Sequence, residues 1–263
     1  MDTSLVGSTA EMDDNERPHA NYVSNFYTAL DVIKRTSPAR SHDIMEIFGG
    51  KAGVTRIATR YRLRTGPNFD LVSGIDLSDA QEINTLWQYL YTYKPRFVVA
   101  GPPCTALGGW SHYNRVHHPE TWEAKYKVGK ALGELVAQIA HFQISQGRHF
   151  VIENPISSDL WSFPSYQSLM ERPNVTFVRC DQCCYGLRDP AGEYTLKPTG
   201  FLCSHFLLTQ RLQRRCNGLH QHVALAGKVN GVSRCSFAQV WPESLCQSVV
   251  NGILDVMLSL IHI

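Results

Sequence analysis

One cysteine stands where a predicted buried strand gives way to a rigid turn. The apolar run Phe97–Ala100 stops at Gly101, and Pro102 and Pro103 lead directly into Cys104. Two prolines fix the backbone and remove two amide donors, so this turn would hold the thiol in one place. A thiolate presented in this way can act as a nucleophile. The alternative is a buried, inert cysteine.

A carboxylic acid follows a second apolar stretch in the same manner. In HFVIENP, Ile152 ends a predicted strand and Glu153 comes next, where burial without a partner would be unfavourable. The carboxyl group could donate to, or protonate, a ring nitrogen, or it could cap a loop. With Cys104 it suits chemistry at C5 of a pyrimidine. The thiolate would add to C6, the carboxyl group would stabilise N3, and C5 would take a methyl group and lose its proton.

Two more segments follow predicted strands. EIFGGKAGVT places Gly50 and Gly53 between a strand and a helix, which suits either close approach of a nucleotide-like cofactor or a simple turn. SGIDLSD places Asp76 where a carboxylate could bind a ribose or an adenine amine, or help Ser78 or Asp79 to cap a helix. Neither a GxGxxG nor a P-loop pattern is present, so neither a dinucleotide nor ATP is indicated.

Apolar runs and helical spacing predict the elements that position these residues. Strands are expected at 43–48, 70–75, 97–100, 149–152 and 175–178, and helices at 22–33, 54–61, 80–91, 122–146 and 245–257. The longest helix carries one apolar stripe, formed by Val128, Leu132, Leu135, Val136, Ile139 and Ala140. This alternation predicts an α/β fold, a mainly parallel sheet with helices on both faces. Ligands bind beyond the carboxyl ends of such strands, so the segments above should meet in one pocket.

The 263 residues allow one substantial α/β domain or two small ones, and a formal net charge of +2 argues neither for nor against nucleic acid. We expect a disordered tail at 1–20, a cofactor-binding and catalytic domain at 21–179, a small Cys/His-containing subdomain at 180–236, and a closing motif with its helix at 237–258. Residues 259–263 look non-native. The acidic, polar start is no signal peptide, and no apolar run is long enough to span a bilayer, so an intracellular protein without a membrane partner is expected.

In their order, these motifs resemble those of the cytosine-C5 methyltransferases, and the chain is most similar to the short, divergent members found in phages and retroelements. IFGGKAG resembles the cofactor motif with Ala52 in place of a usual glycine, GPPC the catalytic Pro-Cys motif, and ENP the Glu-Asn-Val motif. The resemblance implies a Rossmann-like fold, S-adenosylmethionine as cofactor, and Cys104, Glu153 and Asn154 as catalytic residues. The cofactor-binding residues that it implies are Phe48, Gly49, Gly50, Gly53, Asp76, Leu77 and Pro102.

The same resemblance implies duplex DNA with a flipped cytosine as substrate, and a nuclear location in a eukaryote. The glycine-rich loop GGWSHYNRVHH that follows Cys104 could close over a bound base, with Trp110 stacking on the extruded nucleotide and His112, Asn114 and Arg115 touching phosphate or sugar. The alternative is an exposed loop whose tryptophan packs on the domain. Lys197 is a further candidate for substrate binding. The family's Gln-x-Arg-x-Arg pattern is lost, with Lys197 and Thr199 at those positions. Only about 204–236 is left for target recognition, so specificity should be low or supplied by a partner or by fusion in a longer polyprotein. The chain is otherwise expected to be monomeric. RNA as substrate, or an inactive S-adenosylmethionine- or nucleic-acid-binding module, are the alternatives.

The chain also carries eight cysteines, which in an intracellular protein indicate thiols, metal ligands or a nucleophile rather than disulfides. Cys180 and Cys183 have metal-ligand spacing, and Cys216 and His220 follow. These four residues predict a zinc site that would hold a small subdomain together. Buried thiols with surface histidines are the alternative.

Overall fold

The computed structural model describes residues 41–109 and 111–259. Among the described residues, 41–256 form one compact unit, and 257–259 are assigned to a second. The predicted tail at 1–20, the predicted helix at 22–33, Trp110 and residues 260–263 lie outside the described residues. No helix within the described part of the chain has the length and apolar character needed to cross a membrane.

A six-stranded sheet in the order β2-β1-β3-β4-β6-β5 forms the centre of the larger unit. Its strands are β1 (Ile44–Ile47), β2 (Thr65–Phe69), β3 (Phe97–Ala100), β4 (His149–Pro155), β5 (Thr176–Asp181) and β6 (Pro198–Cys203). The pairs among β1 to β4 are parallel, whereas β6 runs antiparallel to both β4 and β5. This confirms the predicted Rossmann-like α/β class. β6 lies within the range assigned to the small subdomain, yet it belongs to the central sheet.

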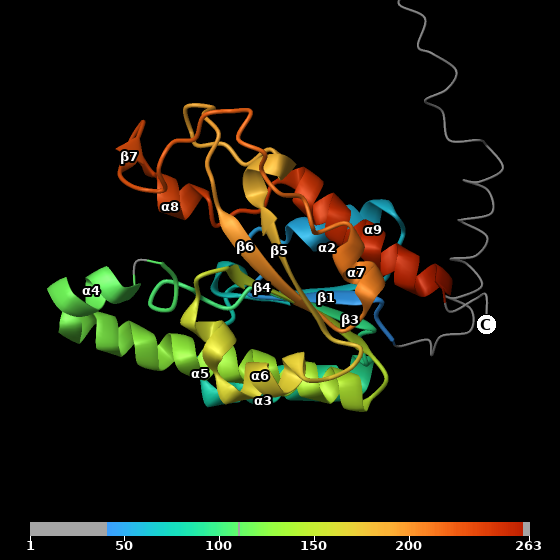
Figure 1. Cartoon of the computed structure of the whole chain (residues 1–263). Coiled ribbons are helices and arrows are strands. Elements are labelled where there is room, and N and C mark those ends of the chain that lie inside the picture. The colour runs from blue at the N-terminus through green and yellow to red at the C-terminus, as the bar shows by residue number, and fades with distance from the viewer. Residues whose placement is uncertain (1–40, 110, 260–263) are drawn as a thin grey trace, which may run out of the picture. The chain divides into compact units, whose positions relative to one another are not determined.

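Helices cover both faces of this sheet. Figure 1 shows α3 (Ala80–Tyr93), α5 (Pro119–Ser145) and α6 (Pro164–Met170) on one face, with α2 (Gly53–Arg60) and α9 (Glu243–Ser259) on the other. Alternating strand residues follow this division, since Met45, Val98 and Ile152 belong to the apolar cluster on the α3 and α5 face. Glu46 and Glu153 occupy the intervening positions and therefore point to the opposite face.

Shorter elements complete the chain. They are η2 (Leu71–Ser73), α4 (Ser111–His117), η3 (Asp159–Ser162), η4 (Gln182–Tyr185), α7 (Phe206–Gln210), β7 (Lys228–Val229), β8 (Val232–Ser233) and α8 (Arg234–Phe237). β7 and β8 form a hairpin whose turn residues, Asn230 and Gly231, both have positive φ, as a two-residue hairpin turn requires.

The strand predicted at 70–75 is wrong. The second strand is β2, which ends at Phe69, while Leu71 and Val72 lie in a 3₁₀ turn and are 70% and 73% exposed. Pro67 concealed the strand, because proline is a strand breaker except at a sheet edge, and β2 is an edge strand. In the predicted stripe of the long helix, Val128 is exposed, and the other five members are buried.

His149, the first residue of β4, makes stability depend on pH. Burial, and to a smaller extent the nearby His205, lower the pKa of His149 to about 4. The unfolded chain takes up this proton near pH 6.5, so the contribution is present above pH 6.5 and is lost as the pH falls from there toward 4. We expect this group alone to remove about 3 kcal/mol of unfolding free energy across that window.

Urea unfolding of wild type and His149→Phe from pH 7 to pH 4 would measure this loss. The phenylalanine ring can still stack on Phe97, as the imidazole does, but it does not titrate. The variant should therefore show a shallower fall of unfolding free energy with acid. Parallel curves for the two proteins would contradict the assignment.

Candidate active site

The carboxyl ends of β1, β2, β3 and β4 open into one cavity of about 440 Å³. Ile47 of β1, Ala100 of β3 and Ile152 of β4 are in register, so the next residues along these three chain segments lie side by side: Phe48, Gly101 and Glu153. A Cβ added to Gly101 would lie 3.3 Å from the Phe48 carbonyl oxygen and 3.8 Å from Glu153 Oε2. Gly101 therefore allows the ends of the three strands to approach one another this closely.

The turn after β1 is held by side chains from the end of β2. Gly49 N donates to Asn68 Oδ1 at 3.1 Å, and Asn68 Nδ2 donates to the Gly50 carbonyl at 2.9 Å. Gly50 N donates to Asp70 Oδ2, also at 2.9 Å. These bonds hold the half-buried glycine-rich backbone at the cavity in place before any ligand binds.

The same turn has an unusual backbone. Phe48, Gly50 and Ala52 all have φ between 51° and 56°, in the left-handed region. For a bulky residue such as Phe48 this conformation is rare, and such strain is found preferentially at functional sites. The left-handed Ala52 also explains why a glycine would suit that position, since only glycine adopts it without steric strain.

Gly53 is required for close packing between two helices rather than for the backbone turn that contains Gly50. It is the first residue of α2, and a Cβ there would lie 2.7 Å from Cys246 Sγ of α9. Both residues line the cavity. Gly53 thus allows α9 to pack against the start of α2, so the C-terminal helix forms one wall of the cavity.

Cys104 lies half-buried at the end of the Pro102-Pro103 turn and lines this cavity. Its carbonyl accepts bonds from Leu107 N at 3.0 Å and Gly108 N at 2.7 Å, which closes the turn behind it. Burial raises the pKa of the thiol, the ammonium group of Lys197 opposes that rise, and the carboxylate of Glu153 adds to it. The Lys197 ammonium and the Glu153 carboxylate therefore both lie near enough to the Cys104 sulfur to affect its pKa.

Glu153 lines the same cavity and is only 6% exposed. Lys197 Nζ lies 3.4 Å from Glu153 Oε1, and Gln182 Nε2 donates to the same oxygen at 3.4 Å. Lys197 also donates to the Ala238 carbonyl at 3.2 Å. The carboxylate, the ammonium and the thiol thus form one cluster, in which each charge has a partner.

Asn154 does not share this position. It follows Glu153 on the opposite face of β4, is 1% exposed, and donates from Nδ2 to the Pro102 carbonyl at 2.8 Å. This bond helps to position the turn that carries Cys104, and the catalytic role that the resemblance implies for Asn154 stays a prediction.

The remaining cofactor candidates belong to the same cavity. Asp76, Leu77 and Pro102 all line it. Asp76 is exposed, and the backbone N–H and hydroxyl of Ser78 hold its pKa below the usual value. The Asp76 carboxylate accepts hydrogen bonds within a local turn and also lines the cavity. This position is compatible with both interpretations of the sequence, a cofactor contact and a helix-capping turn.

Two carboxylates in the lining were missed by sequence reasoning. Asp70 follows β2 and stands twenty residues after Gly50, the spacing at which related folds place a ribose-binding acid. Glu46, inside β1, is 2% exposed and accepts a bond from Thr55 N at 2.6 Å. Burial raises its pKa, and the bonds from Thr55 oppose this. The sequence signal that could have identified Glu46 is the presence of a charged residue within an otherwise apolar strand.

The segment after Cys104 differs from the predicted flexible loop, because 111–117 forms α4. Ser111 Oγ donates to the Ala106 carbonyl at 2.6 Å and accepts from Trp122 Nε1 at 2.9 Å, which ties α4 to α5. His112, Asn114 and Arg115 are among the described residues, and none of them lines the cavity. Arg115 instead lies over the Trp122 ring, 5.3 Å from its centroid.

The predicted metal ligands are brought together only in part. Cys183, Cys216 and His220 cluster with His222, whereas Cys180 does not belong to this group. Cys180 lies within β5, where it is fully buried and pairs with Thr199 of β6. The strand continues through Asp181, so the spacing of Cys180 and Cys183 is not that of a metal-binding turn.

Comparisons with known proteins add little to this geometry. No protein-family model matches the chain, and no curated protein matches it. Among solved structures, the S. pombe Dnmt2 methyltransferase is similar at a TM-score of 0.32 and 7% sequence identity, over 63% of this chain and 50% of that one. The match spans half the length of that structure, and at these values it supports no assignment by itself.

Proposed function

We propose that the protein transfers a methyl group from S-adenosylmethionine to C5 of cytosine, with duplex DNA as the substrate. The observation that carries the proposal is the cluster of Cys104, Glu153 and Lys197 in the cavity that the glycine turn also lines. A nucleophile, a carboxyl group and a cation are the groups that addition to a pyrimidine ring requires.

The cavity suits the charge of this cofactor. Its lining contains four carboxylates and three cations, which are Glu46, Asp70, Asp76 and Glu153, and Lys51, Arg56 and Lys197. A net-negative lining favours a cationic sulfonium ligand over a polyphosphate nucleotide. Asp70 and Asp76 are placed for a ribose or an adenine amine, and Gly49 and Gly50 allow close approach of the backbone. When bound, S-adenosylmethionine supplies an electrophilic methyl group.

The residues of the chain would then act in the following order. The Cys104 thiolate forms a bond to C6, and the displaced electron pair moves toward N3, which receives a proton that Glu153 relays from water. C5 becomes nucleophilic and accepts the methyl group. Water then takes up the C5 proton, the S–C6 bond breaks to return the thiolate and the aromatic ring, and the N3 proton leaves through Glu153. Lys197 stabilises the thiolate before attack and keeps Glu153 in place.

The target base must leave the helix stack to reach this cavity. Trp110, His112, Asn114 and Arg115 remain our candidates for contacts with the nucleic acid outside the cavity, together with Lys197 inside it. His112 and Arg115 are exposed on α4, where they could meet phosphate groups. The short 204–236 segment leaves sequence recognition weak.

Methyl transfer from labelled S-adenosylmethionine, measured side by side on duplex DNA and tRNA, tests the function. Duplex DNA that contains 5-fluorocytosine should form a covalent adduct, because fluorine at C5 blocks release, and peptide mapping should place it on Cys104. Transfer to tRNA alone would reassign the substrate to RNA. Cofactor binding by calorimetry with no transfer to either nucleic acid would identify an inactive binding module and overturn the proposal.

Lys197 should set the pH dependence of the reaction. Its cation lowers the pKa of Cys104, so Lys197→Met should raise that pKa and move the ascending limb of the kcat/KM–pH profile to higher pH. The rate near neutral pH falls as a result, because less thiolate is present.

Site-resolved alkylation of Cys104 against pH gives the same information without a substrate. Lys197→Arg, which keeps the positive charge, serves as the matched control and should titrate close to wild type. If the methionine variant alkylates with an unchanged pH dependence, Lys197 does not tune the thiol.

A further inference from the structure

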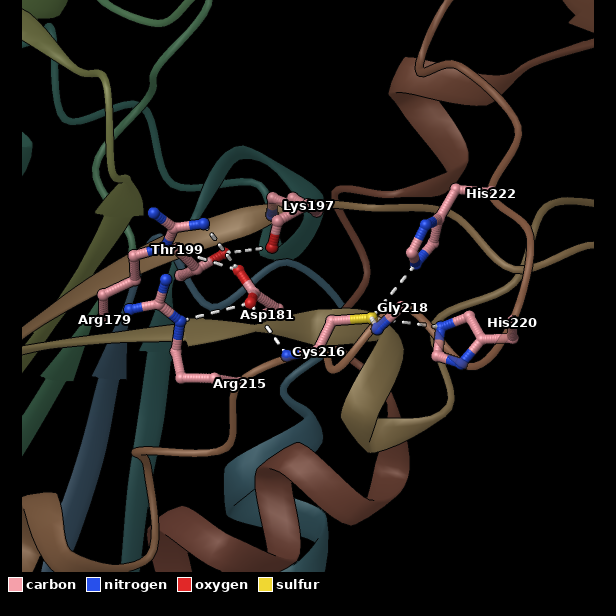
Figure 2. Close-up of polar contacts among 9 residues, drawn as sticks. All are labelled: Arg179, Asp181, Lys197, Thr199, Arg215, Cys216, Gly218, His220 and His222. Atoms are coloured by element: carbon pink, nitrogen blue, oxygen red, sulfur yellow. Dashed lines mark hydrogen bonds and ion pairs between the residues drawn. The ribbon is translucent and has the colours of Figure 1, made fainter.

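The segment that follows the sheet edge brings four ligand-type side chains together. The thiol sulfurs of Cys183 and Cys216 and one ring nitrogen each from His220 and His222 all lie within 4.8 Å of one another. Figure 2 shows both imidazoles directed at the Cys216 sulfur. We propose that these four residues bind one Zn²⁺ ion in a tetrahedral site, and that this ion organises residues 183–223. The proposal does not depend on the function proposed above.

The distances agree with that geometry. Cys216 Sγ lies 3.7 Å from His220 Nε2 and 3.6 Å from His222 Nε2. Ideal Zn–S and Zn–N bonds at a tetrahedral angle would separate sulfur from nitrogen by about 3.5 Å. The present spacing therefore needs only a small contraction to accept the ion.

A cysteine–histidine hydrogen bond explains the arrangement less well. A neutral thiol can donate to only one of the two imidazole nitrogens that face the Cys216 sulfur, so at least one imidazole would have to donate its own N–H to the sulfur. Gly218 N also donates to this sulfur at 3.4 Å. A metal ion bound by the sulfur and both ring nitrogens would account for the positions of all three atoms.

The site has outer-shell support from the central sheet. Asp181 at the end of β5 is 3% exposed and accepts from Cys216 N at 3.0 Å and from Arg215 Nε at 3.2 Å (Figure 2). On the other side, the His220 ring stacks on Tyr194, with centroids 4.1 Å apart. Ligand-bearing segments at 183 and 216–222 are thereby oriented before the ion binds, as metal sites commonly require.

The chain segment around Cys216, His220 and His222 has no hydrophobic core of its own. No residue from 213 to 237, a range that the structure describes in full, is buried. Leu219, between the ligands, is 86% exposed. A segment with so little apolar burial requires another source of stability, and a structural metal ion supplies it in small domains.

Hydrogen bonds connect the neighbours of two proposed zinc ligands to the chain segment that carries Lys197. Gln182, next to Cys183, donates from its backbone N–H to the Lys197 carbonyl at 3.1 Å and from its side chain to Glu153. Val223, next to His222, donates to the Tyr194 carbonyl at 2.9 Å. Metal binding would thus help to hold the backbone at Tyr194 and Lys197 in place. This matters for catalysis only if the proposed function holds.

Metal analysis of the purified full-length chain tests the site. We expect one zinc per chain in wild type and a fall to near zero in Cys216→Ser and His222→Ala. Cys235→Ser and His118→Asn are the matched controls, because both residues are exposed and lie outside the cluster. Both controls should retain one zinc.

A second measurement avoids variants that fail to fold. Wild-type protein stripped with a chelator and titrated with Co²⁺ should bind one ion with the visible bands of a tetrahedral site and a thiolate charge-transfer band. Chelation should also speed proteolysis within 183–223. Wild type that carries little zinc and shows no tetrahedral Co²⁺ spectrum would overturn the proposal, as would equal zinc loss in Cys235→Ser and Cys216→Ser.

Discussion

Cys104→Ala should abolish methyl transfer, lowering the rate by about four orders of magnitude or more, as removal of a covalent nucleophile does in other enzymes. The sulfur is the only atom of this side chain that can form the bond to C6. Affinity for S-adenosylmethionine should stay within a few-fold of wild type, since the glycine turn and Asp70 are unchanged. Bisulfite sequencing of plasmid DNA from cells that express each protein measures the loss.

Two further variants make this result specific. Cys104→Ser keeps the size and polarity of the side chain but supplies an alcohol that does not ionise near neutral pH, so it should be equally inactive and form no adduct with 5-fluorocytosine DNA. Cys235→Ser should retain the adduct, because that thiol does not line the cavity. Full activity in Cys104→Ala would show that the mechanism is wrong.

Glu153→Gln should lower kcat by about 10²- to 10⁴-fold, the range expected when a positioned proton donor is lost. The amide fills the same space but cannot deliver a proton to N3. The substitution also leaves Lys197 without its partner in a nearly buried pair, in which the two side chains are 13% and 8% exposed. We expect a loss of about 2 kcal/mol of unfolding free energy.

Stability and catalysis can be separated by a double variant. Glu153→Gln with Lys197→Met removes both charges, so the destabilisation should shrink because no unpaired charge stays buried. Activity should stay low. Recovery of methyl transfer along with stability would mean that Glu153 acts on the fold and not on the base.

Much of the fold could be predicted because the inner strands are strongly apolar. β1, β3 and β4 appear as short apolar runs bounded by Gly, Pro or polar residues, and buried parallel strands are expected to show this pattern. The carboxyl ends of those strands carry Phe48, Cys104 and Glu153, so their meeting in one cavity followed from the topology alone.

The failures occur where tertiary context outweighs local pattern. β2 contains Gly66 and Pro67, which a central strand would not tolerate but an edge strand does. The helix α4 was interpreted as a loop because glycines precede it and histidines occupy it, and its anchor, the Ser111–Trp122 bond, joins residues eleven apart. His222 was noted in the Cys/His-rich segment but was not chosen among the four predicted ligands, because the chain path that brings it to Cys183 depends on the pairing of β5 with β6.

The packing of Gly53 against Cys246 has a consequence for biosynthesis. Ser236, Gln239, Trp241 and Cys246 close one side of the cavity, and a ribosome makes them after every strand of the central sheet. A nascent chain that has emerged only as far as β6 therefore exposes the thiol and the acid without enclosing them. The cavity therefore cannot close during translation until α9 has left the exit tunnel and docked.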